Sequence, residues 1–148
     1  MDYRIIDTTE AQLAQIEKIE QQSFSCPWTM DQLRSQLSDE RHVFLTAVDN
    51  SGAVLGYVGM MFVLDEGYIS NVAVAPNFRR QGVADTLISA LMTRAEELSL
   101  AFVTLEVRAG NEPAKALYAK HGFVPVGRRK NYYDLPKEDA ILMTCFWK

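Results

Sequence analysis

Stretches of apolar and β-branched residues recur along the chain at lengths typical of strands, and apolar residues at helical spacing lie between them. The stretches that predict strands are 3–6, 42–48, 53–63, 68–74, 101–108, 123–129 and 140–147. The longest contains Gly56 and Gly59, and glycine inside a strand indicates a bulge or a bend. The chain is therefore expected to form many short strands, several of them separated by helices.

The first helix is expected near the N-terminus. Asp7 followed by Glu10 resembles a capping box, which predicts the start of a helix at this point. The apolar face of this helix is predicted to consist of Leu13, Ile16, Ile19 and Phe24. The stretch SCPW, residues 25–28, is expected to end it.

Three further helices follow from similar patterns. Thr29 with Gln32 forms a second capping pattern and predicts a short helix after it. Apolar residues at helical spacing predict a long helix over residues 83–98. Asn111 predicts the start of the last helix and Gly122 its end, because glycine suits the left-handed position after a helix.

One folding unit is expected over the whole chain, residues 1–148. The length fits one domain, 48% of the residues are hydrophobic, and no repeat or long linker interrupts the pattern. The interleaved elements predict an α/β fold with a mixed, mostly antiparallel sheet flanked by helices.

Composition narrows the possible partners. The net charge is −4, whereas proteins that bind nucleic acid are usually basic, so direct nucleic-acid binding is not expected. With two histidines and two cysteines far apart in the sequence, no metal site is expected. Cys26 and Cys145 are predicted to be buried, reduced thiols. The sequence shows neither a signal peptide nor a membrane-spanning run, so a soluble, cytoplasmic protein is expected.

The stretch NVAVAPNFRRQGVADTL, residues 71–87, predicts an anion site. A buried strand leads through a proline, two arginines and a glycine into a helix. The amides of the first helical turn have no partner within the helix and carry partial positive charge. Gly82 lets a ligand approach the backbone, and Arg79 and Arg80 add charge, so the pattern predicts a pyrophosphate cradle. The alternative is a solvated arginine pair beside a helix cap.

The cradle lacks the motifs of two common nucleotide sites. It has no G-x-x-x-x-G-K-[ST], the loop that binds nucleoside triphosphates, and no G-x-G-x-x-G, the fingerprint of dinucleotide binding. Residues 79–84, RRQGVA, instead resemble the R/Q-x-x-G-x-G/A motif of the GCN5-related N-acetyltransferases. Ala84 occupies the last position, where glycine is commoner.

That resemblance implies a fold of the acetyltransferase type and acetyl-CoA as the cosubstrate, with no metal. It also implies that the strand before the motif lies along the pantetheine arm of the cofactor and that the loop amides bind its pyrophosphate. The cofactor-binding residues it implies are Val72, Ala73, Val74, Arg79, Arg80, Gln81, Gly82, Val83, Ala84, Asp85 and Asn111.

Acetyl transfer to an amine needs a proton acceptor and a group that protonates the leaving thiolate. Glu106 interrupts an otherwise apolar strand, where a carboxylate is costly unless it has a partner or a catalytic role. An outward-facing position or a pair with Arg108 is the alternative. Tyr118 lies two helical turns after Asn111 and stays protonated near neutral pH, although a tyrosine that only fills the core is also possible.

The stretch LEVRAGNEPAKALYAKHGF, residues 105–123, resembles the RimI-type N-terminal acetyltransferases, as do FSCPWT and RKNYYDLPKEDAILM. The resemblance implies that Glu106 is the proton acceptor and Tyr118 the proton donor. It implies as acceptor the N-terminal alanine of ribosomal protein eighteen of the small subunit, and related members accept other protein N-termini.

The chemistry of amines favours this kind of acceptor. Neutralising an α-amine at pH 7 costs ~1.4 kcal/mol, against ~4.6 kcal/mol for lysine. Two other functions remain open: acetylation of lysine side chains or small amines, and binding of acetyl-CoA without catalysis. The oligomeric state is not predicted.

Several other residues are candidates for the walls of the site. Tyr132 and Tyr133 are expected in a loop between the last two strands, where they could line a peptide pocket. Trp28 could form the opposite wall or pack in the core. His121 is expected to cap the last helix, and residues 128–130, two arginines and a lysine, are expected to face solvent.

Overall fold

The computed structural model describes residues 2–147, whose seven strands form a single sheet in the order β1-β2-β3-β4-β5-β7-β6. Neighbouring strands are antiparallel except β4 and β5, which are parallel. The predicted mixed, mostly antiparallel sheet is confirmed. The strands are β1 (Tyr3–Asp7), β2 (His42–Asp49), β3 (Val54–Val63), β4 (Glu66–Val74), β5 (Phe102–Arg108), β6 (Val124–Asp134) and β7 (Lys137–Phe146).

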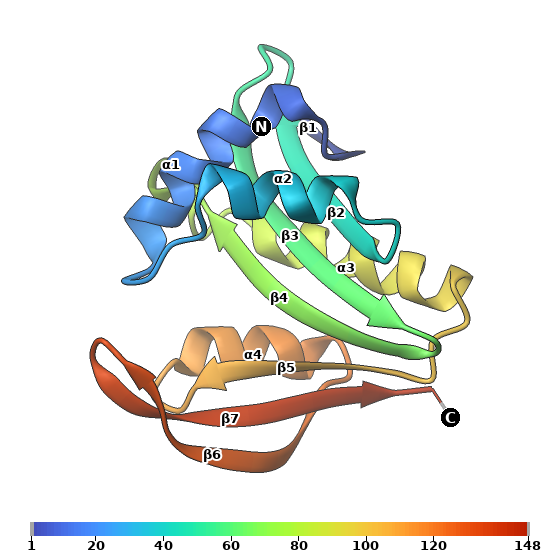
Figure 1. Cartoon of the computed structure of the whole chain (residues 1–148), viewed down its shortest axis with the longest axis vertical. Coiled ribbons are helices and arrows are strands. Elements are labelled where there is room, and N and C mark those ends of the chain that lie inside the picture. Colours follow the sequence, from blue (N-terminus) through green and yellow to red (C-terminus); the bar gives the residue numbers. More distant parts are fainter. Residues whose placement is uncertain (1, 148) are drawn as a thin grey trace.

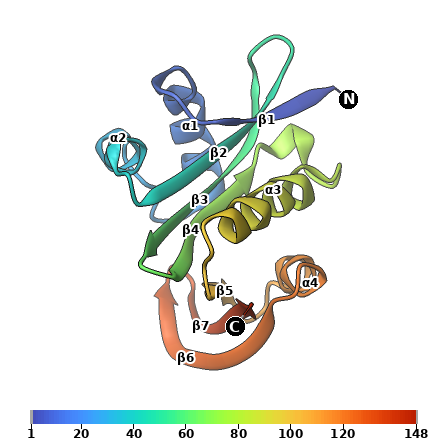
Figure 2. The same ribbon diagram turned by 90° about the vertical axis from the view of Figure 1, so that its right-hand side faces the viewer.

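Four α-helices flank the sheet, with α1 and α2 on one face and α3 and α4 on the other (Figures 1 and 2). They are α1 (Leu13–Ser23), α2 (Met30–Ser38), α3 (Val83–Glu97) and α4 (Glu112–Lys120), with short 3-10 helices at Glu10–Gln12 and Pro76–Phe78. Each face has its own buried apolar cluster, one around α3 and one around α1 and α2. Within residues 2–147, no helix is long and apolar enough to cross a membrane.

The start of the first helix differs from the prediction. Asp7 is the last residue of β1, and the capping box is formed by Thr9 and Gln12, with Thr9 N donating to Gln12 Oε1 at 2.7 Å. Phe24 lies beyond the helix and is 40% exposed, whereas Glu20 is fully buried. The capping box predicted at Thr29 is confirmed, because its Oγ1 accepts from Gln32 N at 3.2 Å.

The sheet divides between its two parallel strands. β4 pairs with β5 only over Glu66–Tyr68 and Phe102–Thr104, and beyond that point the strands diverge (Figure 1). A register shift between Gly59 and Met60 kinks the β3–β4 ladder near this point, as the glycines in this strand predict. At Gly59 an added Cβ would lie 2.7 Å from Asn71 Oδ1, so a larger residue here would displace the Asn71 side chain.

Two predictions about the end of the chain and the cysteines are wrong. Tyr132 and Tyr133 belong to β6, which is longer than predicted and continues past an irregularity in its register between Arg129 and Tyr133. Cys145 is buried, but Cys26, which lies in the loop between α1 and α2, is exposed.

Candidate active site

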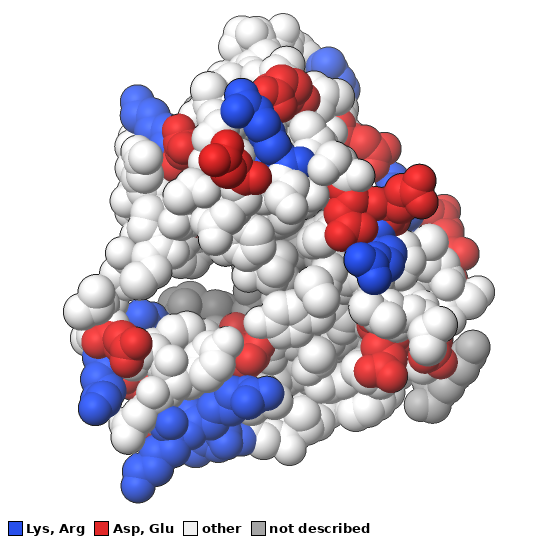
Figure 3. All heavy atoms as spheres, in the orientation of Figure 1, with Lys and Arg blue, Asp and Glu red and all other residues white. Residues whose placement is uncertain are grey.

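The divergence of β4 and β5 opens a groove of about 1030 Å³. Its walls come from the α1–α2 loop, the second half of β4, the start of α3, the end of β5, α4 and the β6–β7 hairpin. The space-filling view shows this hollow between the upper and lower parts of the molecule, with basic side chains gathered below it over β6 (Figure 3). Segments far apart in the sequence therefore meet in one place.

The groove collects nearly all the site residues predicted from the sequence. Those that line it are Val72, Ala73, Val74, Arg79, Arg80, Gly82, Val83, Ala84, Asp85, Glu106, Asn111 and Tyr118. Gln81 is not among the lining residues; its Nε2 donates to Asn77 O at 3.3 Å, which closes the turn before α3.

At one end of the groove lies the N-terminus of α3. Gly82 is the N-cap residue, with a φ of +81°, and no side chain caps this helix end in the described part of the chain. Nothing lies within 4 Å of a Cβ added at Gly82, so its left-handed backbone, rather than space, accounts for glycine here. The amides of Val83–Asp85 are thus left to a ligand, and the helix dipole favours an anion.

The two arginines of the turn differ in their contacts. Arg79 is tied to its surroundings, because its Nε donates to Val74 O at 3.1 Å and its Nη2 to Ser23 Oγ at 3.3 Å. It therefore joins the end of β4 to the end of α1. Arg80 is exposed and has a left-handed φ of +62°. Arg80 is the freer of the two cations to meet a phosphate.

The second half of β4 forms a wall whose backbone lacks a strand partner. On the β5 side, the paired part of β4 ends at Tyr68, so residues 69–74 have no strand partner there in the described structure. Apart from Val74 O, which accepts from Arg79, their outward N–H and C=O groups need partners of another kind. This edge offers hydrogen bonds to an extended ligand that carries amides.

Glu106 lies on β5 with only 10% of its side chain exposed. Its Oε2 lies 3.4 Å from Arg129 Nε, whereas its Oε1 is buried and has no hydrogen-bond partner among residues 2–147. The alternative partner Arg108 instead pairs with Glu138, Nη1 to Oε1, at 3.3 Å. Arg129 was expected to face solvent as part of a basic run; its side chain is 56% exposed, as expected, and it forms this ion pair in addition.

The Glu106 carboxylate affects the pKa values of two nearby tyrosines. Burial, followed by the neighbouring Glu106 carboxylate, raises the pKa of Tyr68 and raises the pKa of Tyr133 to about 12. Both therefore stay neutral around Glu106 at physiological pH. A buried carboxylate oxygen without a partner, surrounded by neutral hydroxyls, is suited to accept a proton.

Tyr118 reaches the groove from α4. It is 6% exposed and packs against Phe123, with ring centroids 5.8 Å apart. Burial, and to a lesser extent Tyr133, raises the pKa of its phenol, which keeps it protonated. Asn111 begins this helix, its Oδ1 accepting from Ala114 N at 3.2 Å, as its predicted capping role requires. Tyr118 can therefore donate a proton into the groove.

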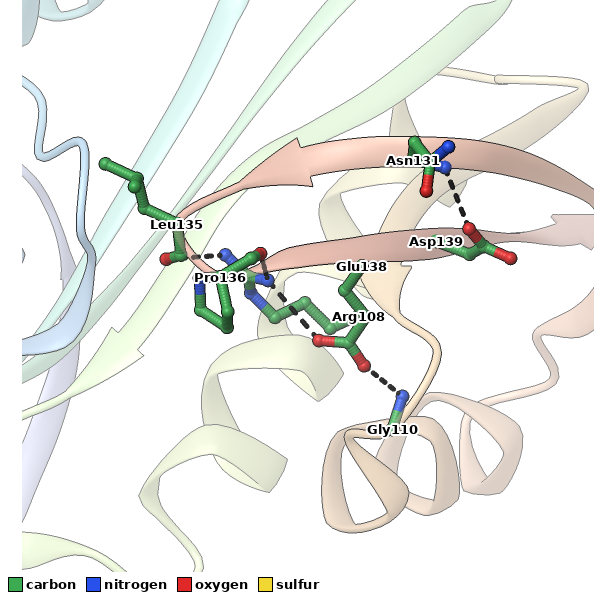
Figure 4. Close-up of polar contacts among 7 residues, drawn as sticks. All are labelled: Arg108, Gly110, Asn131, Leu135, Pro136, Glu138 and Asp139. Carbon is green, nitrogen blue, oxygen red and sulfur yellow. Dashed lines mark hydrogen bonds and ion pairs between the residues drawn. The ribbon is translucent and has the colours of Figure 1, made fainter.

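The β6–β7 hairpin is anchored through Arg108 on β5 and through Gly110 in the turn before α4 (Figure 4). Near its tip, Arg108 donates to the carbonyl oxygens of Leu135 and Pro136 at 3.3 and 2.8 Å and lies 4.3 Å from the centre of the Tyr133 ring. Glu138 joins this cluster to the turn before α4, because its Oε2 accepts from Gly110 N at 2.7 Å. The anchoring turns the aromatic part of the hairpin into a fixed wall of the groove.

Glu20 is a site residue that the sequence analysis missed. It is fully buried beneath the groove, where Oε1 accepts from Trp28 N at 2.8 Å and Oε2 accepts from Asn71 Nδ2 at 3.1 Å and from the Tyr57 hydroxyl. Its carboxylate thus fixes the α1–α2 loop, which lines the groove opposite the hairpin. The available signal was its spacing, one helical turn after Ile16 on the apolar face.

The donor set of the groove does not suggest a metal centre. Among the described residues, no group of three or more His, Cys, Asp or Glu side chains is placed to hold an ion. The groove instead combines an open helix N-terminus, an unpaired strand edge, a buried carboxylate and a buried phenol.

Comparisons with known proteins agree with this geometry. The sequence model of the acetyltransferase (GNAT) family matches residues 13–123. A ribosomal protein bS18-alanine N-acetyltransferase of Haemophilus influenzae is 34% identical over 146 residues, covering 96% of this chain and 98% of that protein.

Two solved structures extend the comparison. The ribosomal-protein-S18-alanine N-acetyltransferase of Escherichia coli superimposes with a TM-score of 0.90 at 32% identity, covering 98% of this chain and 94% of that chain. A chain of the NatC complex bound to Gag peptide and CoA gives 0.88 at 25% identity and covers both chains completely. The fold and the sequence thus point to the same group of proteins.

Proposed function

Because the chain belongs to the acetyltransferase (GNAT) family, we propose that it transfers an acetyl group from acetyl-CoA to the N-terminal amine of a protein. The names of its relatives identify the acceptor that we propose, the N-terminal alanine of ribosomal protein bS18. Other protein N-termini are possible further acceptors in this proposal. Ribosomal proteins are made in the cytoplasm, so we place the reaction there.

The groove has the features that acetyl-CoA requires. The uncapped amides at the start of α3 suit its diphosphate, and the unpaired edge of β4 suits the amides of its pantetheine arm. A structure of the NatC complex, a relative by fold, contains CoA. When bound, acetyl-CoA supplies a thioester carbonyl that an amine attacks and a sulfur that leaves as a thiolate.

One observation carries the catalytic proposal: a group that can accept a proton, Glu106, and a group that can donate one, Tyr118, line the same groove. Glu106 presents a buried oxygen without a partner, which accepts the proton that the attacking nitrogen loses. Tyr118 is a phenol kept protonated by burial, which donates a proton to the departing sulfur. Together they leave an amide and a thiol.

The test uses the purified chain with acetyl-CoA and a peptide that copies the first residues of bS18. We expect thiol release together with an acetyl group on the α-nitrogen, located by mass spectrometry. An acetyl group found only on lysine side chains would assign the protein to the lysine or small-amine class. No thiol release with any amine would leave a cofactor-binding module.

A further inference from the structure

Arg129 reaches the proposed base from a neighbouring part of the sheet. It lies on β6, Glu106 lies on β5, and β7 runs between them, so the side chain spans a strand to bring its Nε within 3.4 Å of Glu106 Oε2. Its Cζ also lies 5.8 Å from the centre of the Tyr132 ring. The guanidinium is thus held between the carboxylate and an aromatic wall of the groove.

The backbone that carries Arg129 is fixed on both sides. Asp139 on β7 accepts from Arg128 Nε at 2.7 Å and from Asn131 N at 2.8 Å, at the irregularity in the β6–β7 register (Figure 4 shows the contact with Asn131). Asn131 has a left-handed φ of +53°, which asparagine tolerates better than most residues. The direction of Arg129 toward Glu106 is therefore built into the hairpin.

The two members of the pair are exposed very differently. The side chain of Arg129 is 56% exposed, and that of Glu106 is 10% exposed. Arg129 occupies only Oε2 and leaves Oε1 without a partner in the described structure. The positive charge therefore covers the solvent side of the carboxylate without blocking the oxygen that is free to take a proton.

This arrangement has a consequence for the acceptor. An unpaired buried carboxylate attracts any ammonium ion, and an ammonium cannot attack a carbonyl. A carboxylate and an arginine form an ion pair with no net charge, and the guanidinium repels a second cation. We propose that Arg129 excludes the protonated form of the acceptor, so that the site binds its amine only in the neutral form. This role rests on the function proposed above.

Two tyrosines lie near Glu106, Tyr68 from β4 and Tyr133 from β6, and both have raised pKa values, so they stay neutral in the relevant range. Tyr132 lies beside Arg129. Arg108, near Tyr133, is paired with Glu138. The group that titrates between about pH 6.5 and 8.5 is therefore the α-amine of the acceptor, whose pKa is about 8.

The test measures KM for the N-terminal peptide as a function of pH, with saturating acetyl-CoA. If only the neutral amine binds, the wild-type KM falls roughly 25-fold between about pH 6.5 and 8.5, following the fraction of neutral amine. In Arg129→Gln the ammonium form binds as well, so KM changes by less than about threefold, and kcat at the lower pH drops because the bound ammonium is unreactive.

Two variants serve as controls. Arg129→Lys keeps the positive charge and is expected to restore the wild-type slope of KM. Lys130→Gln removes the same charge from an exposed neighbour that makes no ion pair within residues 2–147, and is expected to keep the wild-type slope. If Arg129→Gln lowers kcat equally at every pH and keeps the slope of KM, Arg129 only positions Glu106 and the proposal is overturned. A wild-type protein that fails to acetylate α-amines would instead overturn the proposed function and this role with it.

Discussion

Asp85 and His121 connect the two helices that serve the proposed reaction. Asp85 Oδ1, in the first turn of α3, lies 2.7 Å from His121 Nε2, at the end of α4, and 3.2 Å from Lys120 Nζ. The N-terminus of α3 is the proposed diphosphate site, and α4 carries Tyr118. The contact fixes the distance between the anion site and the proton donor, and it pairs a carboxylate that would otherwise repel the diphosphate.

This contact should be visible in the acid stability of the protein. The hydrogen bond from His121, followed by that from Lys120, lowers the pKa of Asp85. Its stabilising contribution is therefore complete above the ~3.9 of an unfolded aspartate and is lost as the pH falls through the lowered folded-state pKa. We expect the difference in unfolding free energy between wild type and Asp85→Asn to shrink below about pH 4. Urea unfolding across this range measures it, and a difference that persists unchanged at the lowest pH would contradict the assignment.

Tyr118→Phe tests the proton donor. It removes a hydroxyl and leaves the ring packed against Phe123, so the fold should be unchanged. Loss of a general acid is expected to lower kcat by roughly 10²–10⁴-fold, with little change in the affinity for acetyl-CoA. Steady-state kinetics and a binding titration give the two quantities. Normal turnover in this variant would show that another group protonates the thiolate.

Glu106→Gln tests the proton acceptor with a side chain of the same shape. At neutral pH we expect kcat/KM to fall by roughly 10²–10⁴-fold, because the amide cannot take the proton. The deficit should keep a similar size across the pH range, because the site binds the α-amine in its neutral form and Glu106 takes the proton that the nitrogen loses on attack. A pH profile of kcat and KM for wild type and variant checks this. A deficit confined to KM, with kcat unchanged, would indicate that Glu106 acts on binding instead.

Glu20→Gln tests the buried anchor of the α1–α2 loop. The glutamine oxygen can replace one carboxylate oxygen, but its NH₂ group would then face donors, either Trp28 N or both Asn71 Nδ2 and the Tyr57 hydroxyl. Leaving a buried donor without a partner costs about 1–3 kcal/mol, and we expect a loss of this size in unfolding free energy. Tyr57→Phe is the matched control, because it removes one donor and leaves the bond to Trp28 N intact. It should cost less and leave KM for the peptide unchanged, whereas Glu20→Gln should raise that KM.

The sequence pattern predicted the elements well because most of them follow from local periodicity. The strands, the Thr29 and Asn111 caps and the turn at Gly82 all depend on residues within a few positions of one another. The start of the first helix was predicted wrongly because two overlapping pairs, Asp7 with Glu10 and Thr9 with Gln12, both fit a capping box. β1 pairs through Asp7 with Leu45, and that contact with a distant strand decides between them.

The parts of the site that were missed depend on contacts between distant segments. Tyr132 and Tyr133 continue a strand because Asp139, across the hairpin, holds the irregular part of β6. The polar sequence around them is typical of a loop, and local patterns do not reveal such an anchor. Glu20 looks like an ordinary helix glutamate until Tyr57 and Asn71 are brought beside it by the sheet.

The proposed function depends most on the N-terminus of α3 as the site for the cofactor diphosphate. A titration of the ¹⁵N-labelled protein with coenzyme A, followed by amide chemical shifts, tests this directly. We predict saturable shifts that are largest at Gly82, Val83, Ala84 and Asp85, since their N–H groups would receive the diphosphate. Saturation with coenzyme A that leaves these amides unchanged and shifts a different region would contradict the account.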